Sequence, residues 1–112
     1  MNRYPVYIKY KNDIITRKTT EDTLSSPQDV KSLVIQAFPL VKDKGNLHLF
    51  WCKSKEGPLH QLINDQDYTN LAHWHTQNYS SCINVYDSIN EVILIDKEEW
   101  KQSINKINEL FE

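Results

Sequence analysis

The clearest chemistry in this 112-residue chain belongs to basic side chains on two neighbouring segments. Lys9 lies within YPVYIKY (residues 4–10), and Arg17 and Lys18 form a basic pair further along the chain. One exposed ion pair contributes only ~0–1 kcal/mol to an association. A cluster of complementary charges can set orientation, partner choice and association rate. An interface therefore requires these three side chains to act together, with Lys11 in support. The alternative is that all are ordinary solvated charges.

Carboxylates form a second, weaker group in the stretch LHLFWCKSKEGPLHQLINDQDYTNL. Glu56 lies in a turn that contains two lysines, and Asp65 and Asp67 follow after a short apolar run. Carboxylates at the turn and at a helix start could lie on one edge of the fold. We expect an acidic patch suited to a basic partner. Asp65 and Asp67 could also act as acid and base, but acidic residues at a positive helix end explain them more simply.

Histidines and aromatic residues invite two further interpretations. His73 and His75 flank Trp74, and with His60 and His48 they suggest zinc ligands, but no CxxC or HExxH spacing accompanies them. We expect instead no metal, and a polar loop in which Trp74 packs against the sheet. Two pairs of neighbours, Tyr7 with Lys9 and Trp51 with Lys53, could stack on single-stranded bases. Strand aromatics are more often cross-strand pairs, so we expect no nucleic acid.

Catalysis has little support in the sequence. Cys52 and Cys82 fall inside predicted strands, and we expect two buried free thiols. Only two glycines are present, which excludes a glycine-rich phosphate loop. No nucleophile lies in a recognised strained turn. The sequence therefore predicts a protein that is not an enzyme and takes no cofactor.

Composition places the chain among globular proteins. A 39% hydrophobic and 25% charged composition is typical of that class, and a net charge of −2 gives no general reason to expect nucleic-acid binding. No apolar run is long enough to cross a bilayer, and the N-terminus lacks an apolar signal core. We expect a cytoplasmic or nucleocytoplasmic protein with no membrane contact. The length predicts a single domain over residues 1–112.

Hydrophobic periodicity predicts the elements that position these residues. Residues 4–10 and 14–20 alternate as a two-stranded hairpin, and a helix begins after Ser26 and ends near Phe38, before Pro39. A strand over 47–52, a turn at 53–58, a strand over 59–63 and a short capped helix follow. Residues 21–25 and 73–81 are expected to be irregular, and 82–86 to be a strand.

The last residues add a strand-like piece over 92–95 and an amphipathic helix. Its apolar face contains Trp100, Ile104, Ile107 and Phe111. This face is too apolar to remain in water. We expect the helix to dock onto its own domain. The alternatives are that it binds a groove of another protein or associates with a second copy of this chain.

This order of elements predicts an α+β fold of the ubiquitin-like β-grasp type. Its sheet is mixed, with four to five strands, one main helix packed across it, and a C-terminal helix. The core spans about residues 4–88, and residues 89–112 are the addition. With these elements placed, the sequence resembles the PB-one (Phox and Bem-one) domain over roughly Val6 to Asp87. The resemblance rests on YIKY, the Arg17-Lys18 pair, PQDVKSLVIQAF and FWCKSKEGPLHQLINDQD.

The resemblance implies a scaffold module that pairs head to tail with other PB-one domains in signalling assemblies. A basic face around a first-strand lysine meets an acidic loop of a partner, which assigns that role to Lys9, supported by Arg17 and Lys18. The acidic turn departs from the family pattern, because Glu56 is its one carboxylate, although Asp65 and Asp67 remain. We therefore expect a basic-face domain that binds an acidic PB-one partner. Two-faced self-association is the second expectation.

A different function shares this fold and these basic residues. In small-GTPase-binding domains of the Ras-association type, the second strand adds to the sheet edge of the GTPase. Only that function requires GTP on the partner.

Overall fold

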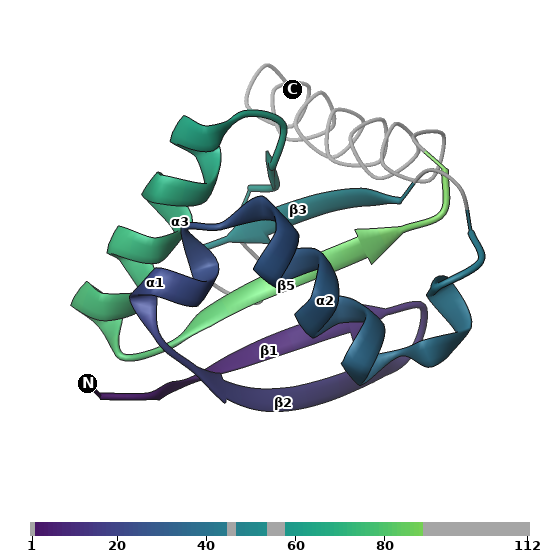
Figure 1. The fold of residues 1–112 in the computed structure, drawn as a ribbon, viewed down its shortest axis with the longest axis horizontal. Coiled ribbons are helices and arrows are strands. Elements are labelled where there is room, and N and C mark those ends of the chain that lie inside the picture. Colours follow the sequence, from purple (N-terminus) through teal and green to yellow (C-terminus); the bar gives the residue numbers. More distant parts are fainter. Residues whose placement is uncertain (1, 45–46, 54–57, 89–112) are drawn as a thin grey trace, which may run out of the picture.

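The computed structural model describes residues 2–44, 47–53 and 58–88. These residues form a five-stranded mixed sheet in the order β2-β1-β5-β3-β4 (Figure 1). The strands are β1 (Tyr4–Tyr10), β2 (Asp13–Thr19), β3 (His48–Cys52), β4 (His60–Gln61) and β5 (Ser81–Tyr86). β1 runs parallel to β5 and antiparallel to β2, and β3 runs antiparallel to both β4 and β5. The predicted mixed sheet is confirmed.

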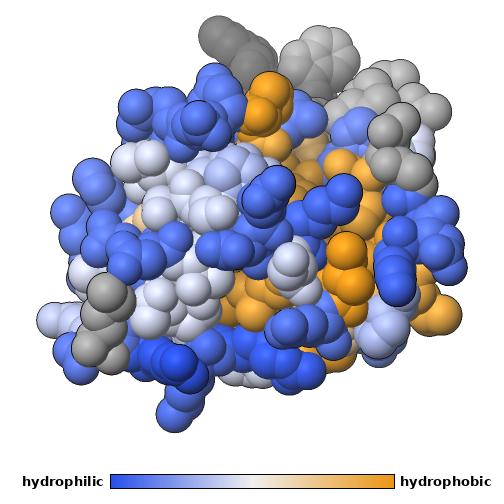
Figure 2. All heavy atoms as spheres, in the orientation of Figure 1, coloured by the Kyte–Doolittle hydropathy of each residue, from blue (hydrophilic) through white to orange (hydrophobic). Residues whose placement is uncertain are grey.

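Helix α2 (Pro27–Ala37) crosses one face of the sheet, and α3 (Asp65–Asn78) lies beside it (Figure 1). Val6 and Ile8 of β1, Val30 and Val34 of α2, and Leu71 of α3 are all fully buried in one core. Figure 2 shows apolar side chains around α2, with hydrophilic residues over much of the remaining visible surface.

The predicted start of α2 is confirmed. The Ser26 side chain accepts the Asp29 N–H at 3.4 Å, and Pro27 occupies the first turn, where its missing N–H costs nothing. The helix ends at Ala37, and Phe38 is its C-cap, because Pro39 disfavours helical geometry at the residue before it. A short 3-10 helix, η1 (Pro39–Val41), follows.

Two predicted irregular segments are helical. Residues 21–24 form α1 (Glu21–Leu24), which Thr20 caps and Leu24 anchors in the core. The second segment, 73–78, continues α3 to Asn78, where Tyr79 leaves the helix with φ 59°. The physical reason is that His75 is buried and continues the apolar face begun by Leu71. His75 is therefore a core-facing residue at a position that the hydrophobicity pattern does not identify as apolar.

Several predictions lie outside the described residues. They are the Glu56-Gly57 turn, the strand over 92–95, and the terminal helix with its apolar residues. Among the described residues, no helix is long and apolar enough to cross a membrane.

Candidate protein-interaction surface

The outer face of the β1–β2 hairpin brings two of the predicted basic residues together. Lys9 lies directly opposite Ile14, and Lys18 lies directly opposite Pro5. Side chains alternate along β1, so Lys9 points away from the core that contains Val6 and Ile8. Lys9 and Lys18 are exposed and about 13 Å apart along the hairpin, which is four residues of strand rise. Lys9 and Lys18 therefore share the outer face of the hairpin, and their role in binding stays a prediction.

Arg17 lies on the other side of the sheet. It is opposite Val6 in the hairpin register, and opposite residues share a face, so Arg17 is on the side of α2. The Arg17 guanidinium is exposed at the sheet edge and donates to the carbonyl of Thr16 at 3.1 Å. The expectation that Arg17 and Lys18 act on one face therefore conflicts with strand geometry.

Ile14 is an exposed apolar residue on the same face as Lys9 and Lys18, and the sequence analysis did not single it out. It remains 54% exposed although it is a large β-branched side chain in a strand. It lies opposite Lys9 and on the same face as Lys18. We name Lys9, Ile14 and Lys18 the β1–β2 face. Ile14 therefore lies beside Lys9 at one end of this face, and Lys18 lies at the other end. Period-two alternation of the hairpin would have placed Ile14 on this face.

Lys11 belongs to a different cluster, at the end of β1. Its Nζ lies 3.8 Å from Asp87 Oδ2, and Lys44 Nζ lies 3.2 Å from the same oxygen. The Tyr10 hydroxyl contacts both Asp87 carboxylate oxygens at 2.9 Å and accepts from Lys44 at 2.7 Å. These contacts raise the pKa of Lys44, chiefly through the hydrogen bond to Tyr10. Lys11 thus has an intramolecular carboxylate.

The lysines of the β1–β2 face form no such ion pair with a carboxylate of the described residues. Within residues 2–44, 47–53 and 58–88, no ion pair involves Lys9, Arg17 or Lys18. Lys9 and Lys18 are therefore available for the carboxylates of another molecule.

Asp65 and Asp67, two of the predicted acidic residues, lie in the first turn of α3. Asn64 accepts the Asp67 N–H at 3.0 Å, and Asp67 Oδ2 accepts the N–H groups of Asn64 and Ile63 at 3.0 and 2.9 Å. This capping box lowers the pKa of Asp67, mainly through the Asn64 N–H. Asp65, in the first turn, is exposed, whereas Glu56 lies outside the described residues. Asp67 thus has a structural role, and Asp65 is the free carboxylate at this end.

The four histidines that were considered as zinc ligands have different surroundings in the structure. His73 and His75 lie on a helix, so they do not share a face as they would on a strand. His73 is exposed, with Nε2 3.7 Å from Glu21. His75 is fully buried, with Nδ1 2.7 Å from Ser81 Oγ and Nε2 3.2 Å from the Thr19 carbonyl. Burial lowers the pKa of His75, which favours the neutral ring. His75 therefore joins α3 to β2 and β5.

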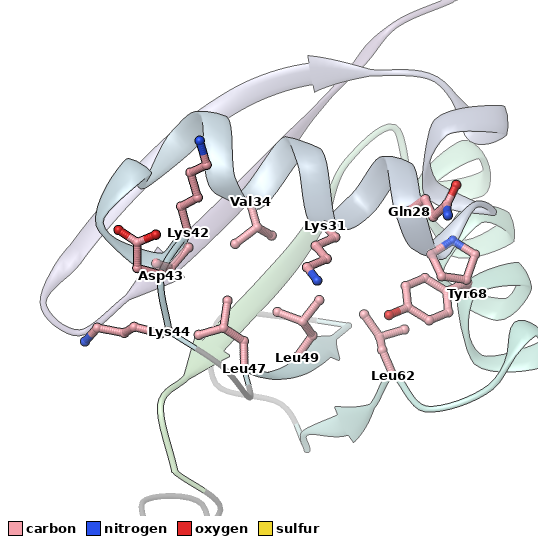
Figure 3. Close-up of a pocket in the computed structure, with 12 residues that line it drawn as sticks. Gln28, Lys31, Val34, Lys42, Asp43, Lys44, Leu47, Leu49, Leu62 and Tyr68 are labelled. Carbon is pink, nitrogen blue, oxygen red and sulfur yellow. The ribbon is translucent and has the colours of Figure 1, made fainter.

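A groove of about 450 Å³ separates α2 from the β3–β4 side of the sheet. Leu47, Leu49 and Leu62 form its apolar wall, and Lys31 extends from α2 toward Leu49 (Figure 3). Tyr68 of α3 closes one end. The groove is on the opposite side of the sheet from Lys9, so it is separate from the β1–β2 face.

Comparison with known proteins identifies the fold. No protein-family model and no curated protein matches the chain. Among solved structures, it is similar to the AtNBR1-PB1 domain, at 17% identity and a TM-score of 0.54, covering 77% of this chain and 98% of that one. It is also similar to AtNBR1-PB1 in an L-type filament determined by cryo-electron microscopy. There the identity is 18% and the TM-score 0.58, with the same coverage.

These likenesses confirm the fold predicted from the sequence. The chain has the ubiquitin-like β-grasp fold of PB1 (PB-one) domains.

Proposed function

We propose that this chain is a protein-interaction module that docks its β1–β2 face onto an acidic loop of a partner PB1 domain. The observation that carries the proposal is the exposed, unpaired Lys9 beside exposed Ile14, on a PB1 fold. The two lysines set orientation and association rate, and Ile14 supplies an apolar contact beside Lys9. The proposed place of action is the cytoplasm, and the proposed role is that of a scaffold.

The face is built on a rigid element, which suits electrostatic docking. Lys9 lies on β1, a strand that pairs with β2 on one side and β5 on the other. Its charge is therefore fixed relative to Lys18, and a partner loop of matching carboxylate spacing gains two contacts at once. We include Arg17 as a secondary contact for a partner that wraps around the edge of β2.

Titration calorimetry with a PB1 domain that carries an acidic loop tests the proposal. Lys9→Ala should weaken binding at least about fivefold at low salt, equivalent to ~1 kcal/mol. Ile14→Ser should weaken binding while leaving the salt dependence unchanged. Lys31→Ala, a lysine on α2, is the matched control and should bind as the parent does. Equal affinity for Lys9→Ala and the parent would refute the docking face.

Self-association tests the acidic end of the same molecule. A PB1 domain with both faces forms heterologous, head-to-tail contacts, which produce open chains or rings. We propose that the acidic end, at Asp65 with Glu56 and Asp67, is too weak to do this. Light scattering should then give a constant mass across protein concentrations. Growth in mass that falls with salt, and that both Lys9→Ala and Asp65→Asn abolish, would show that both faces work.

The Ras-association function remains the second candidate because β2 is an edge strand of the described sheet. An edge strand presents unpaired backbone groups to which a partner strand can add. Binding to a small GTPase that depends on GTP rather than GDP would favour this function over PB1 pairing.

A further inference from the structure

Cys52 and Cys82 occupy directly opposite positions on β3 and β5, which run antiparallel. Opposite Cα atoms in such a pair are about 4.5–5.5 Å apart. A disulfide spans Cα separations of about 4.4–6.8 Å. The backbone therefore already has the spacing that a bond between these two sulfurs requires.

The two thiols interact with each other and with polar neighbours. The Cys82 S–H donates to the Cys52 sulfur, and Asn84 Nδ2 donates to the same sulfur at 3.2 Å. These hydrogen bonds and the nearby Lys9 charge outweigh burial and lower the pKa of the Cys52 thiol to about 7. The lowered pKa favours the thiolate of Cys52, and the thiolate is the reactive form of cysteine.

Access to the sulfurs comes from a small cavity of about 190 Å³. Both cysteines line it, together with Tyr7 of β1 and Trp74 of α3. Cys52 is 1% exposed as a whole residue, and Cys82 is half-buried. A small oxidant fits this cavity, whereas a second protein molecule does not. The geometry thus favours a bond within one chain over a bond between chains.

We propose that Cys52 and Cys82 form a redox-sensitive dithiol that a hydroperoxide converts into an intramolecular disulfide beside Lys9. The Cys52 thiolate attacks one peroxide oxygen, the O–O bond breaks, and the leaving oxygen takes a proton, which leaves Cys52 as a sulfenic acid. Cys82 then attacks that sulfur, the S–O bond breaks, and hydroxide leaves as water with the Cys82 proton. Each sulfur loses one electron, and the peroxide gains two.

This site goes beyond partner docking but is adjacent to the docking face. In β1, Tyr7 lies opposite Cys82, and Lys9 lies opposite Asn84, which donates to Cys52. The disulfide removes the negative charge that the Cys52 thiolate places near Lys9. The oxidised chain therefore carries a more positive environment at Lys9 than the reduced chain does.

The experiment treats the parent chain with hydrogen peroxide, alkylates it with iodoacetamide under denaturing conditions, and measures the intact mass. The expected product is a monomer that has lost two hydrogens and takes up no alkyl group. Digestion should yield one peptide pair linked through Cys52 and Cys82, and dithiothreitol should restore both thiols. Full alkylation of both cysteines after peroxide, or a disulfide-linked dimer, would overturn the proposal.

Variants separate the two steps. Cys82→Ser should accumulate a Cys52 sulfenic acid after peroxide, which dimedone traps. In Cys52→Ser, the dimedone adduct at Cys82 should form more slowly than the Cys52 adduct forms in Cys82→Ser. Lys9→Ala should raise the pKa of Cys52, measured by thiolate absorbance, whereas Lys18→Ala, which is farther away, should leave it unchanged. Adducts confined to Cys82 in the parent, or equal thiolate titrations for both lysine variants, would contradict the assigned roles. These readouts require no partner, so they are independent of docking.

Discussion

His75→Leu is expected to destabilise the fold strongly, because His75 is a fully buried polar residue whose ring nitrogens both have hydrogen-bond partners. Its ring is fully buried. Nδ1 forms a hydrogen bond with Ser81 Oγ at 2.7 Å, and Nε2 forms one with the Thr19 carbonyl at 3.2 Å. Leucine has a comparable volume but leaves both partners unsatisfied. Each buried unsatisfied group costs about 1–3 kcal/mol, so the loss is ~2–6 kcal/mol. A total stability of about 5–15 kcal/mol makes that a large fraction.

Urea unfolding measures this loss. With a denaturant slope of ~2 kcal/mol per M, the midpoint should fall by roughly 1–3 M. His73→Leu is the matched control on the same helix, because His73 is exposed, and it should stay within about 0.5 kcal/mol of the parent. An unchanged midpoint for His75→Leu would show that the two hydrogen bonds do not stabilise the packing of α3 on the sheet.

The same residue predicts a pH dependence. Burial holds the pKa of His75 below its ordinary 6.5, so the unfolded chain binds a proton more readily than the folded chain. The stabilisation is complete above pH 6.5 and declines as pH falls from 6.5 toward the folded pKa. Unfolding midpoints measured between pH 5 and 8 should show this decline in the parent. The decline should be smaller in His75→Leu, and equal declines would contradict the assignment.

Two further substitutions test other contacts. Asp67→Asn should lower the thermal midpoint more than Asp65→Asn does, because Asp67 alone accepts two backbone N–H groups; equal effects would contradict the capping role. Since the folded pKa of Asp67 is lowered, its contribution is present above pH 3.8 and declines as pH falls through the folded value. Tyr10→Phe removes the hydroxyl between Asp87 and Lys44 and should cost about 0.5–1.5 kcal/mol in urea unfolding; a variant as stable as the parent would show that the cluster adds nothing.

Local sequence signals predicted much of the fold. The strand over residues 4–10 and the Ser26-capped helix depend on period-two and period-four patterns, and both are present in the structure. The continuation of α3 was missed for a physical reason. A buried histidine with two hydrogen bonds behaves as a core residue, whereas a hydrophobicity pattern predicts that a histidine lies on the surface.

The candidate site was predictable in part. The role of Lys9 was inferred from the resemblance to PB-one domains and stays a prediction. Period two alone requires adjacent Arg17 and Lys18 to lie on opposite faces. Other features depend on pairings that connect distant parts of the chain. The opposition of Cys52 to Cys82 results from the register of β3 against β5, which no local pattern encodes. The contact of Lys44 with Asp87 likewise spans 43 residues.

The most direct test of the docking claim is a map of amide NMR shifts as an acidic-loop PB1 domain is added to this chain. We expect the largest perturbations at Lys9, Ile14 and Lys18, and we expect them to diminish at high salt. Perturbations confined to the groove residues Lys31 and Leu49, with the β1–β2 face unchanged, would contradict the docking claim.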